Sequence, residues 1–157
     1  MRGGGTFAGA KAAYGQVFTT YDGKFVAVNA ATGEVVWQSI IGNTYATPAF
    51  SDDGSKVFIN AGSTLYAFDT STGAQLWSFS PPVVGNFNAC RIKYANGTLF
   101  MSFDYGLSAY VGAFSAHVGT AVWTYLVPAY VDGLALYGNT LYFGTYSGQV
   151  YALARIF

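Results

Sequence analysis

The stretch LYAFDTSTGAQLW, residues 65–77, decides how this chain folds. Residues 65–69 predict a strand whose side chains alternate between two faces. Thr72-Gly73 predicts a tight turn, because glycine adopts the positive φ that such turns need. A second strand follows and carries Trp77. The stretch therefore predicts a β-hairpin.

The same phrase occurs elsewhere in the chain. It stands at residues 25–37 as FVAVNAATGEVVW. It returns in degraded form as SAY at 108–110, followed by VGTAVW at 118–123, and a fourth copy begins as VYALA at 150–154. An internal repeat of this kind determines the fold class.

Three positions of the phrase recur with one period. The tryptophans lie 40 and 46 residues apart, at Trp37, Trp77 and Trp123. A large aromatic residue recurs at steps of 40, 42 and 42, at Phe18, Phe58, Phe100 and Tyr142. A small residue recurs at steps of 40, 42 and 43, at Ala27, Ala67, Ala109 and Ala152. A unit of about 40 residues with four short antiparallel strands is typical of a β-propeller blade, as in WD40 repeats.

The sequence thus predicts an all-β chain of about three and three-quarter blades, each a four-stranded antiparallel sheet, in an incomplete ring. We expect residues 1–157 to form one partial propeller domain, with blades at approximately 6–40, 41–81, 82–127 and 128–157. The first strands of these blades are expected at 6–13, 45–50, 88–94 and 131–136. A longer second turn at 104–106 and a longer segment before Gly119 would account for the wider spacing of the third blade.

Composition excludes several classes of protein. Hydrophobic residues make up 52% of the 157 residues, which is enough apolar surface to exclude a disordered chain. Seven basic and seven acidic residues cancel, so no field attracts nucleic acid or acidic lipid. The sequence contains no run of eighteen apolar residues, so it predicts no membrane helix. We therefore expect neither a nucleic-acid nor a membrane partner.

The repeated phrase resembles the repeat of PQQ-like (quinoprotein-type) β-propellers. In that family alternating apolar residues lead to Asp, two or three variable residues, Thr-Gly, and Trp four positions after the Gly. The match is near complete at 65–77 and at 25–37, where Asn29 replaces Asp. At 108–123 the Gly and the Trp remain, Val118 replaces Thr, and the Asp position is undefined.

The resemblance implies that the repeated Trp is structural, packing between adjacent blades and anchoring the Thr-Gly turn. The motif residues with this implied role are Thr32, Gly33, Trp37, Thr72, Gly73, Trp77, Gly119 and Trp123. The alternative is aromatic stacking on a flat cofactor or a sugar. It fits less well, because a Trp at a repeated position does the same job in every blade.

The resemblance also implies that the ring is incomplete, because whole members of the family generally have about eight blades. Blade four would present an unpaired apolar strand and blade one an uncovered apolar face. Exposed apolar edges of this kind recruit another chain. We expect a second copy, or further blades of a longer parent, to complete the ring, or the units to stack into an open assembly. A separate protein partner is a further alternative.

The dehydrogenases of this family hold a quinone with two adjacent cysteines and a Trp platform, beside a calcium ion bound by Glu, Asn and Asp. Here Cys90 stands alone, and Glu34 falls at a solvated position after a turn. The adjacent pair Asp52-Asp53 fits a hairpin turn better than a calcium cage. His117 has no nucleophile or carboxylate at a recognisable spacing. We therefore expect no catalytic residue, cofactor or metal site in this chain.

Three charged residues are candidate ligand contacts in the central channel. Arg91 and Lys93 alternate on a first strand that should line the channel, and Asp132 stands at the corresponding start of the fourth unit.

Together these observations favour a non-catalytic propeller module for protein binding, scaffolding or self-assembly. The alternative is a fragment of a PQQ-dependent dehydrogenase whose catalytic blades lie outside this chain. The resemblance suggests the periplasm or the cell exterior, although nothing in these residues shows export.

Overall fold

The computed structural model describes residues 9–44, 46–80 and 92–154 of the chain. Its strands form four antiparallel sheets, and no helix occurs among these residues. In each sheet the strands pair in chain order, so each sheet is a meander. The sheets are called blades one to four below.

Blade one contains β1 (Lys11–Ala13), β2 (Gln16–Tyr21), β3 (Lys24–Asn29) and β4 (Val35–Ile40). Blade two contains β5 (Ala49–Phe50), β6 (Lys56–Ala61), β7 (Thr64–Asp69) and β8 (Gln75–Phe79). Blade three contains β9 (Lys93–Ala95), β10 (Thr98–Tyr105), β11 (Ser108–Ser115) and β12 (Ala121–Val127). Blade four contains β13 (Val131–Tyr137), β14 (Thr140–Thr145) and β15 (Val150–Ala154).

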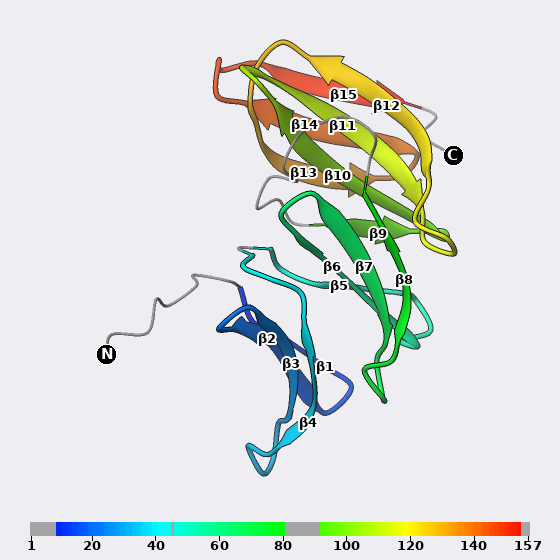
Figure 1. Cartoon of the computed structure of the whole chain (residues 1–157). Coiled ribbons are helices and arrows are strands. Elements are labelled where there is room, and N and C mark those ends of the chain that lie inside the picture. The colour runs from blue at the N-terminus through cyan, green and yellow to red at the C-terminus, as the bar shows by residue number, and fades with distance from the viewer. Residues whose placement is uncertain (1–8, 45, 81–91, 155–157) are drawn as a thin grey trace.

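The blades follow one another along an open arc, from the blue N-terminal sheet to the red C-terminal strand in Figure 1. The first strands of neighbouring blades lie close together, β5 beside β9 and β9 beside β13. The predicted all-β fold of antiparallel blades in an unclosed ring is therefore confirmed, including a fourth blade with three described strands.

The first strands of blades one to three differ from the prediction. Within the described residues they cover only 11–13, 49–50 and 93–95, whereas the sequence predicted strands of six residues or more. In blade two the reason is local, because Pro48 directly precedes β5 and has no N–H to donate to a sheet. Parts of the other two predicted strands lie outside the described residues.

The third blade also differs. The sequence predicted strands at 99–103 and 107–113 with a longer turn between them, but β10 and β11 each run for eight residues around a two-residue turn. The extra residues therefore lengthen the hairpin and not its turn.

This longer hairpin changes which alanine of blade three is equivalent to Ala27 and Ala67. Phe18 pairs with Ala27 and Phe58 with Ala67, but Phe100 pairs with Ala113. Ala109, which the sequence spacing had aligned with them, lies four residues earlier, opposite Asp104. The alignment at Ala109 was wrong.

Three hydrophobic clusters fill the three junctions between blades, and each draws on two neighbouring sheets. The cluster between blades one and two includes Phe18, Ala27, Trp37, Val57, Ile59 and Phe68. The cluster between blades two and three includes Phe58, Ala67, Leu99, Met101, Phe103 and Phe114. The cluster between blades three and four includes Phe100, Ala113, Val131, Leu134, Leu141 and Phe143. Among the described residues no such cluster joins blade one to blade four.

The repeated Trp lies at these junctions and reaches into the next blade. The indole N–H of Trp37 donates to the carbonyl oxygen of Thr70 at 2.9 Å, and that of Trp77 to Ala116 at 3.2 Å. A Cβ added to Gly73 would collide with the Trp37 ring, and one added to Gly119 would lie 2.7 Å from the Trp77 ring. Each of these two indoles therefore packs on the glycine of the following blade's turn.

The glycine contact can be separated from the cost of positive φ by two alanine substitutions. Gly73 (φ 71°) and Gly33 (φ 76°) occupy the same turn position, but a Cβ at Gly33 meets no atom within 4 Å. We expect Gly33→Ala to lower the free energy of unfolding by about 1 kcal/mol, from backbone strain alone. Gly73→Ala should cost a further ~1–3 kcal/mol because the methyl group displaces Trp37. Urea unfolding measures both, and equal losses would contradict the packing role.

Candidate functional site

The Thr-Gly turns are built by an acidic or amide side chain at the end of the third strand. Asp69 Oδ1 accepts hydrogen bonds from the N–H groups of Ser71 at 3.0 Å and Thr72 at 2.8 Å, and from both hydroxyls. These bonds, that from the Ser71 hydroxyl first, lower the pKa of Asp69 to about 2. Asn29 accepts the equivalent backbone bonds from Ala31 and Thr32. Asp and Asn therefore do the same work in the two turns.

Ser115 fills this position in blade three, where the sequence left it undefined. Its N–H donates to the carbonyl of Thr120, and its own carbonyl accepts from the N–H of Gly119 at 2.7 Å. Asp69 makes the corresponding bonds with Ala74 and Gly73. The Ser115 hydroxyl accepts from the N–H of His117 at 3.2 Å. The signal that identifies Ser115 is its place four residues before the turn glycine.

The structure places two of the three predicted channel residues. Lys93 lies on β9 and is half-buried, Asp132 lies exposed near the start of β13, and Arg91 is outside the described residues. The sequence missed Lys11 on β1, whose ammonium lies 5.2 Å from the centre of the Phe50 ring. Partial burial and the charge of Lys93 lower the pKa of Lys11. Lys11 and Lys93 are thus two cations on first strands that interact electrostatically.

The residues considered for chemistry are spread over separate turns. Glu34 is exposed and shares hydrogen bonds with Thr32 in the first Thr-Gly turn. Asp53 accepts from Ser51 and Ser55 in the β5–β6 hairpin, and these bonds lower its pKa to about 2. His117 is exposed beside Ser115, and Cys90 lies outside the described residues.

Across residues 9–44, 46–80 and 92–154, no three His, Cys, Asp or Glu side chains gather as a metal site. The same residues include no helix that is long and apolar enough to span a membrane.

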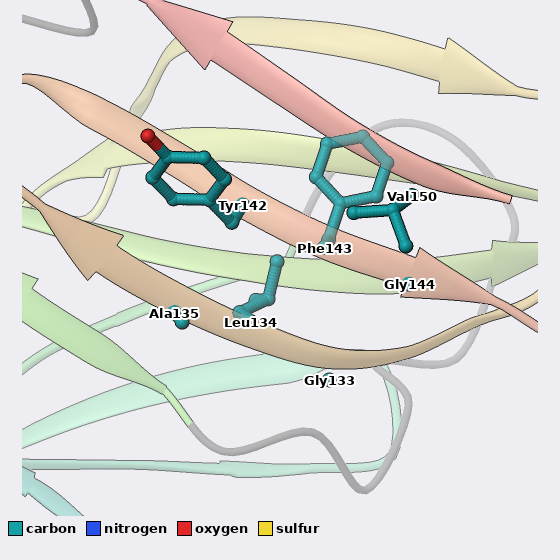
Figure 2. Close-up of a pocket in the computed structure, with 7 residues that line it drawn as sticks. All are labelled: Gly133, Leu134, Ala135, Tyr142, Phe143, Gly144 and Val150. Carbon is teal, nitrogen blue, oxygen red and sulfur yellow. The ribbon is translucent and has the colours of Figure 1, made fainter.

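The outward face of blade four is hollowed. Gly133 of β13 and Gly144 of β14 lie directly opposite each other and carry no side chains. A cavity of about 300 Å³ lies over them, bordered by Tyr142 and Val150. Figure 2 shows the Tyr142 ring on one side of Phe143 and the Val150 side chain on the other, with Gly144 close to Val150. The lining is almost entirely apolar, so the hollow fits an apolar or aromatic side chain.

Comparison with family models gives the family. The model described as outer membrane protein assembly factor BamB matches residues 2–106. The chain belongs to this family. The sequence finds no match among curated proteins.

Solved structures share the fold. BamB from Moraxella catarrhalis is 21% identical, with a TM-score of 0.70, over 90% of this chain and 44% of that one. The quinohemoprotein alcohol dehydrogenase ADHIIG from Pseudomonas putida HK5 is 16% identical, with a TM-score of 0.77, over 96% of this chain and 32% of that one. The computationally designed Ika4 protein is 15% identical, with a TM-score of 0.75, over 96% and 93%. The chain therefore spans less than half the length of the BamB and dehydrogenase chains.

This BamB-family chain also exposes an apolar cluster that the sequence did not reveal. The Tyr130 hydroxyl donates to the carbonyl of Gly106 at 2.8 Å, and the Tyr130 and Tyr146 rings meet edge to face at 6.5 Å. Leu107, next to Gly106, is among the most exposed large side chains of the chain. Tyrosine at such a surface is typical of protein–protein contacts.

Substitution of Asp69 tests how the turn is held. Because the pKa of Asp69 falls from 3.8 to about 2 on folding, its stabilisation is complete above pH 4 and is lost as the pH falls towards 2. Asp69→Ala should lower the free energy of unfolding at pH 7 by about 1 kcal/mol. Asp69→Asn, which copies Asn29, should cost less and should reduce the loss of stability between pH 4 and 2. Urea unfolding at pH 7, 4 and 3 measures this, and identical acid profiles for the wild type and Asp69→Asn would refute it.

Proposed function

We propose that this chain is a non-catalytic propeller module that binds or scaffolds other protein chains. The observation that carries this proposal is the structural role of the repeated Trp. The most distinctive side chains of the repeat, Trp37 and Trp77, are bonded to the neighbouring blade and are not available as a platform for a cofactor. The family match to BamB, an outer membrane protein assembly factor by name, supports the same function.

The surface supports protein binding. Two apolar regions are exposed, the hollowed face of blade four and the cluster of Leu107, Tyr130 and Tyr146. Exposed apolar patches with tyrosine are the chemistry of protein contacts. The role of Lys93 and Asp132, with Lys11, as contacts for a polar ligand in the channel remains a proposal, as do the blade boundaries given from the sequence.

The second candidate is a segment of a quinoprotein dehydrogenase whose catalytic blades lie elsewhere. The specific observation that favours it is the similarity in fold to the quinohemoprotein alcohol dehydrogenase. Against a quinone site within this chain stand the single Cys90 in the sequence and the separation of Glu34 and Asp53 in different turns.

A cofactor titration tests whether this chain itself contributes to a quinone site. The absorbance spectrum of PQQ with calcium ions should stay unchanged as the chain is added, because the chain offers neither a cysteine pair nor a free Trp platform. The control is the same titration with a chelator present. A spectral change that saturates with chain concentration, and that the chelator removes, would overturn the proposed function in favour of the dehydrogenase segment.

A further inference from the structure

Each end of the arc presents one sheet face without a neighbour. Side chains alternate across a strand, so residues that pair in register share a face. On blade one, the face turned away from blade two carries Val17, Thr19, Tyr21, Lys24, Val26 and Val28, and is called the first end face. Val26 at its centre is buried. On blade four, the face turned away from blade three carries Ala135, Tyr137, Tyr142, Val150 and Ala152, and is called the last end face.

The last end face repeats the arrangement of side chains that each blade packs against the next blade along the chain. Within the chain, Phe18, Phe58 and Phe100 stand opposite an alanine and are fully buried against the next blade. Tyr142 stands opposite Ala152 in the same way, but 37% of it is exposed. The large-aromatic-and-alanine pair is thus present on blade four without the sheet that covers it elsewhere.

The first end face corresponds in position to the face that a blade packs against the preceding blade. Blade two receives blade one with Val57, Ile59 and Ala61 on β6. The pair Gln16–Asn29 in blade one corresponds to the pair Lys56–Asp69 in blade two. Counted from these pairs, Val17, Thr19 and Tyr21 on β2 occupy the positions of the three β6 residues. Lys24 is the charged side chain among these positions of the two end faces, and the chain has no net charge to oppose association.

The two end faces also complement each other in shape. Thr20 follows Phe18 by two residues in blade one, and Asn60 follows Phe58 by two residues in blade two. Both side chains are buried at a junction. Blade four has Gly144 at this position, and with Gly133 it leaves the hollow of about 300 Å³. The first end face carries Tyr21, a large side chain that is 71% exposed. One face thus lacks a side chain and the other projects one.

We propose that a second copy of this chain is the partner: the last end face of one copy docks on the first end face of the other, with Tyr21 in the hollow beside Tyr142. The contact is head to tail, and the proposal is that two such contacts close a ring of two copies and do not extend into an open assembly. Two copies also match about the length of one BamB chain, of which a single copy covers 44%. This inference rests on the proposed function, because it names one partner of a protein-binding module.

Two variants and one control test the proposal, with light scattering and sedimentation as the readouts. Tyr142→Arg and Tyr21→Arg each place a charge in the contact, whereas Tyr125→Arg changes a tyrosine on β12 that is 43% exposed and lies on neither end face. We expect the wild type and Tyr125→Arg to be dimers. Each of the other two variants should weaken dimerisation at least about tenfold, with unchanged circular dichroism and urea unfolding.

Mixing the two variants identifies the head-to-tail geometry. A pair of one Tyr142→Arg chain and one Tyr21→Arg chain has both charges in one contact and leaves the other contact intact. The mixture should therefore recover dimers that neither variant forms alone. A contact of blade four with itself would be broken by Tyr142→Arg, left intact by Tyr21→Arg, and would overturn the proposal.

The remaining outcomes are equally decisive. A monomeric wild type, or open-ended species larger than a dimer, would overturn the two-copy ring. The PQQ titration is independent of mass, so a monomer that binds no quinone contradicts only this inference. A dimer that binds quinone with calcium contradicts only the proposed function.

Discussion

The packing of an indole on the glycine of the next blade's turn is the interaction on which this structure depends. Trp37 lies on Gly73 and donates to Thr70, so one side chain fixes the distance and the rotation between two sheets. Only glycine permits this approach, because a Cβ at that place would occupy the ring's own space. The turn must also adopt positive φ, which glycine allows at low cost. Packing and backbone conformation thus require the same residue.

This contact explains the composition of the chain. A blade between two others is covered on both faces, so its inner strands carry aromatic and β-branched side chains and few charges. Charged residues make up only 9% of the sequence and several sit in turns, where Asp69 and Asp53 accept backbone and hydroxyl hydrogen bonds. A chain built this way has apolar faces wherever the arc ends. The proposed contact between two copies would cover these faces.

The proposed function places the binding role of this chain in its surfaces. On the first strands, partial burial and the charge of Lys93 lower the pKa of Lys11. The Leu107, Tyr130 and Tyr146 cluster lies at hairpin and inter-blade loops and leaves the end faces free. The end faces that we propose to bind a second copy and these loops are therefore separate surfaces of the chain.

The sequence by itself determined the hairpin, the repeat and the blade, because alternation, the turn glycine and the Trp are local signals within about a dozen residues. It did not determine the register of blade three. Two extra residues in each of β10 and β11 preserve the alternation of faces, so Ala109 and Ala113 both point inward and spacing alone cannot choose between them. Pairing across the sheet chose Ala113. The partner of Trp37, 33 residues away, and the hollow between Gly133 and Gly144 were likewise decided only by tertiary structure, because both depend on which strands lie side by side.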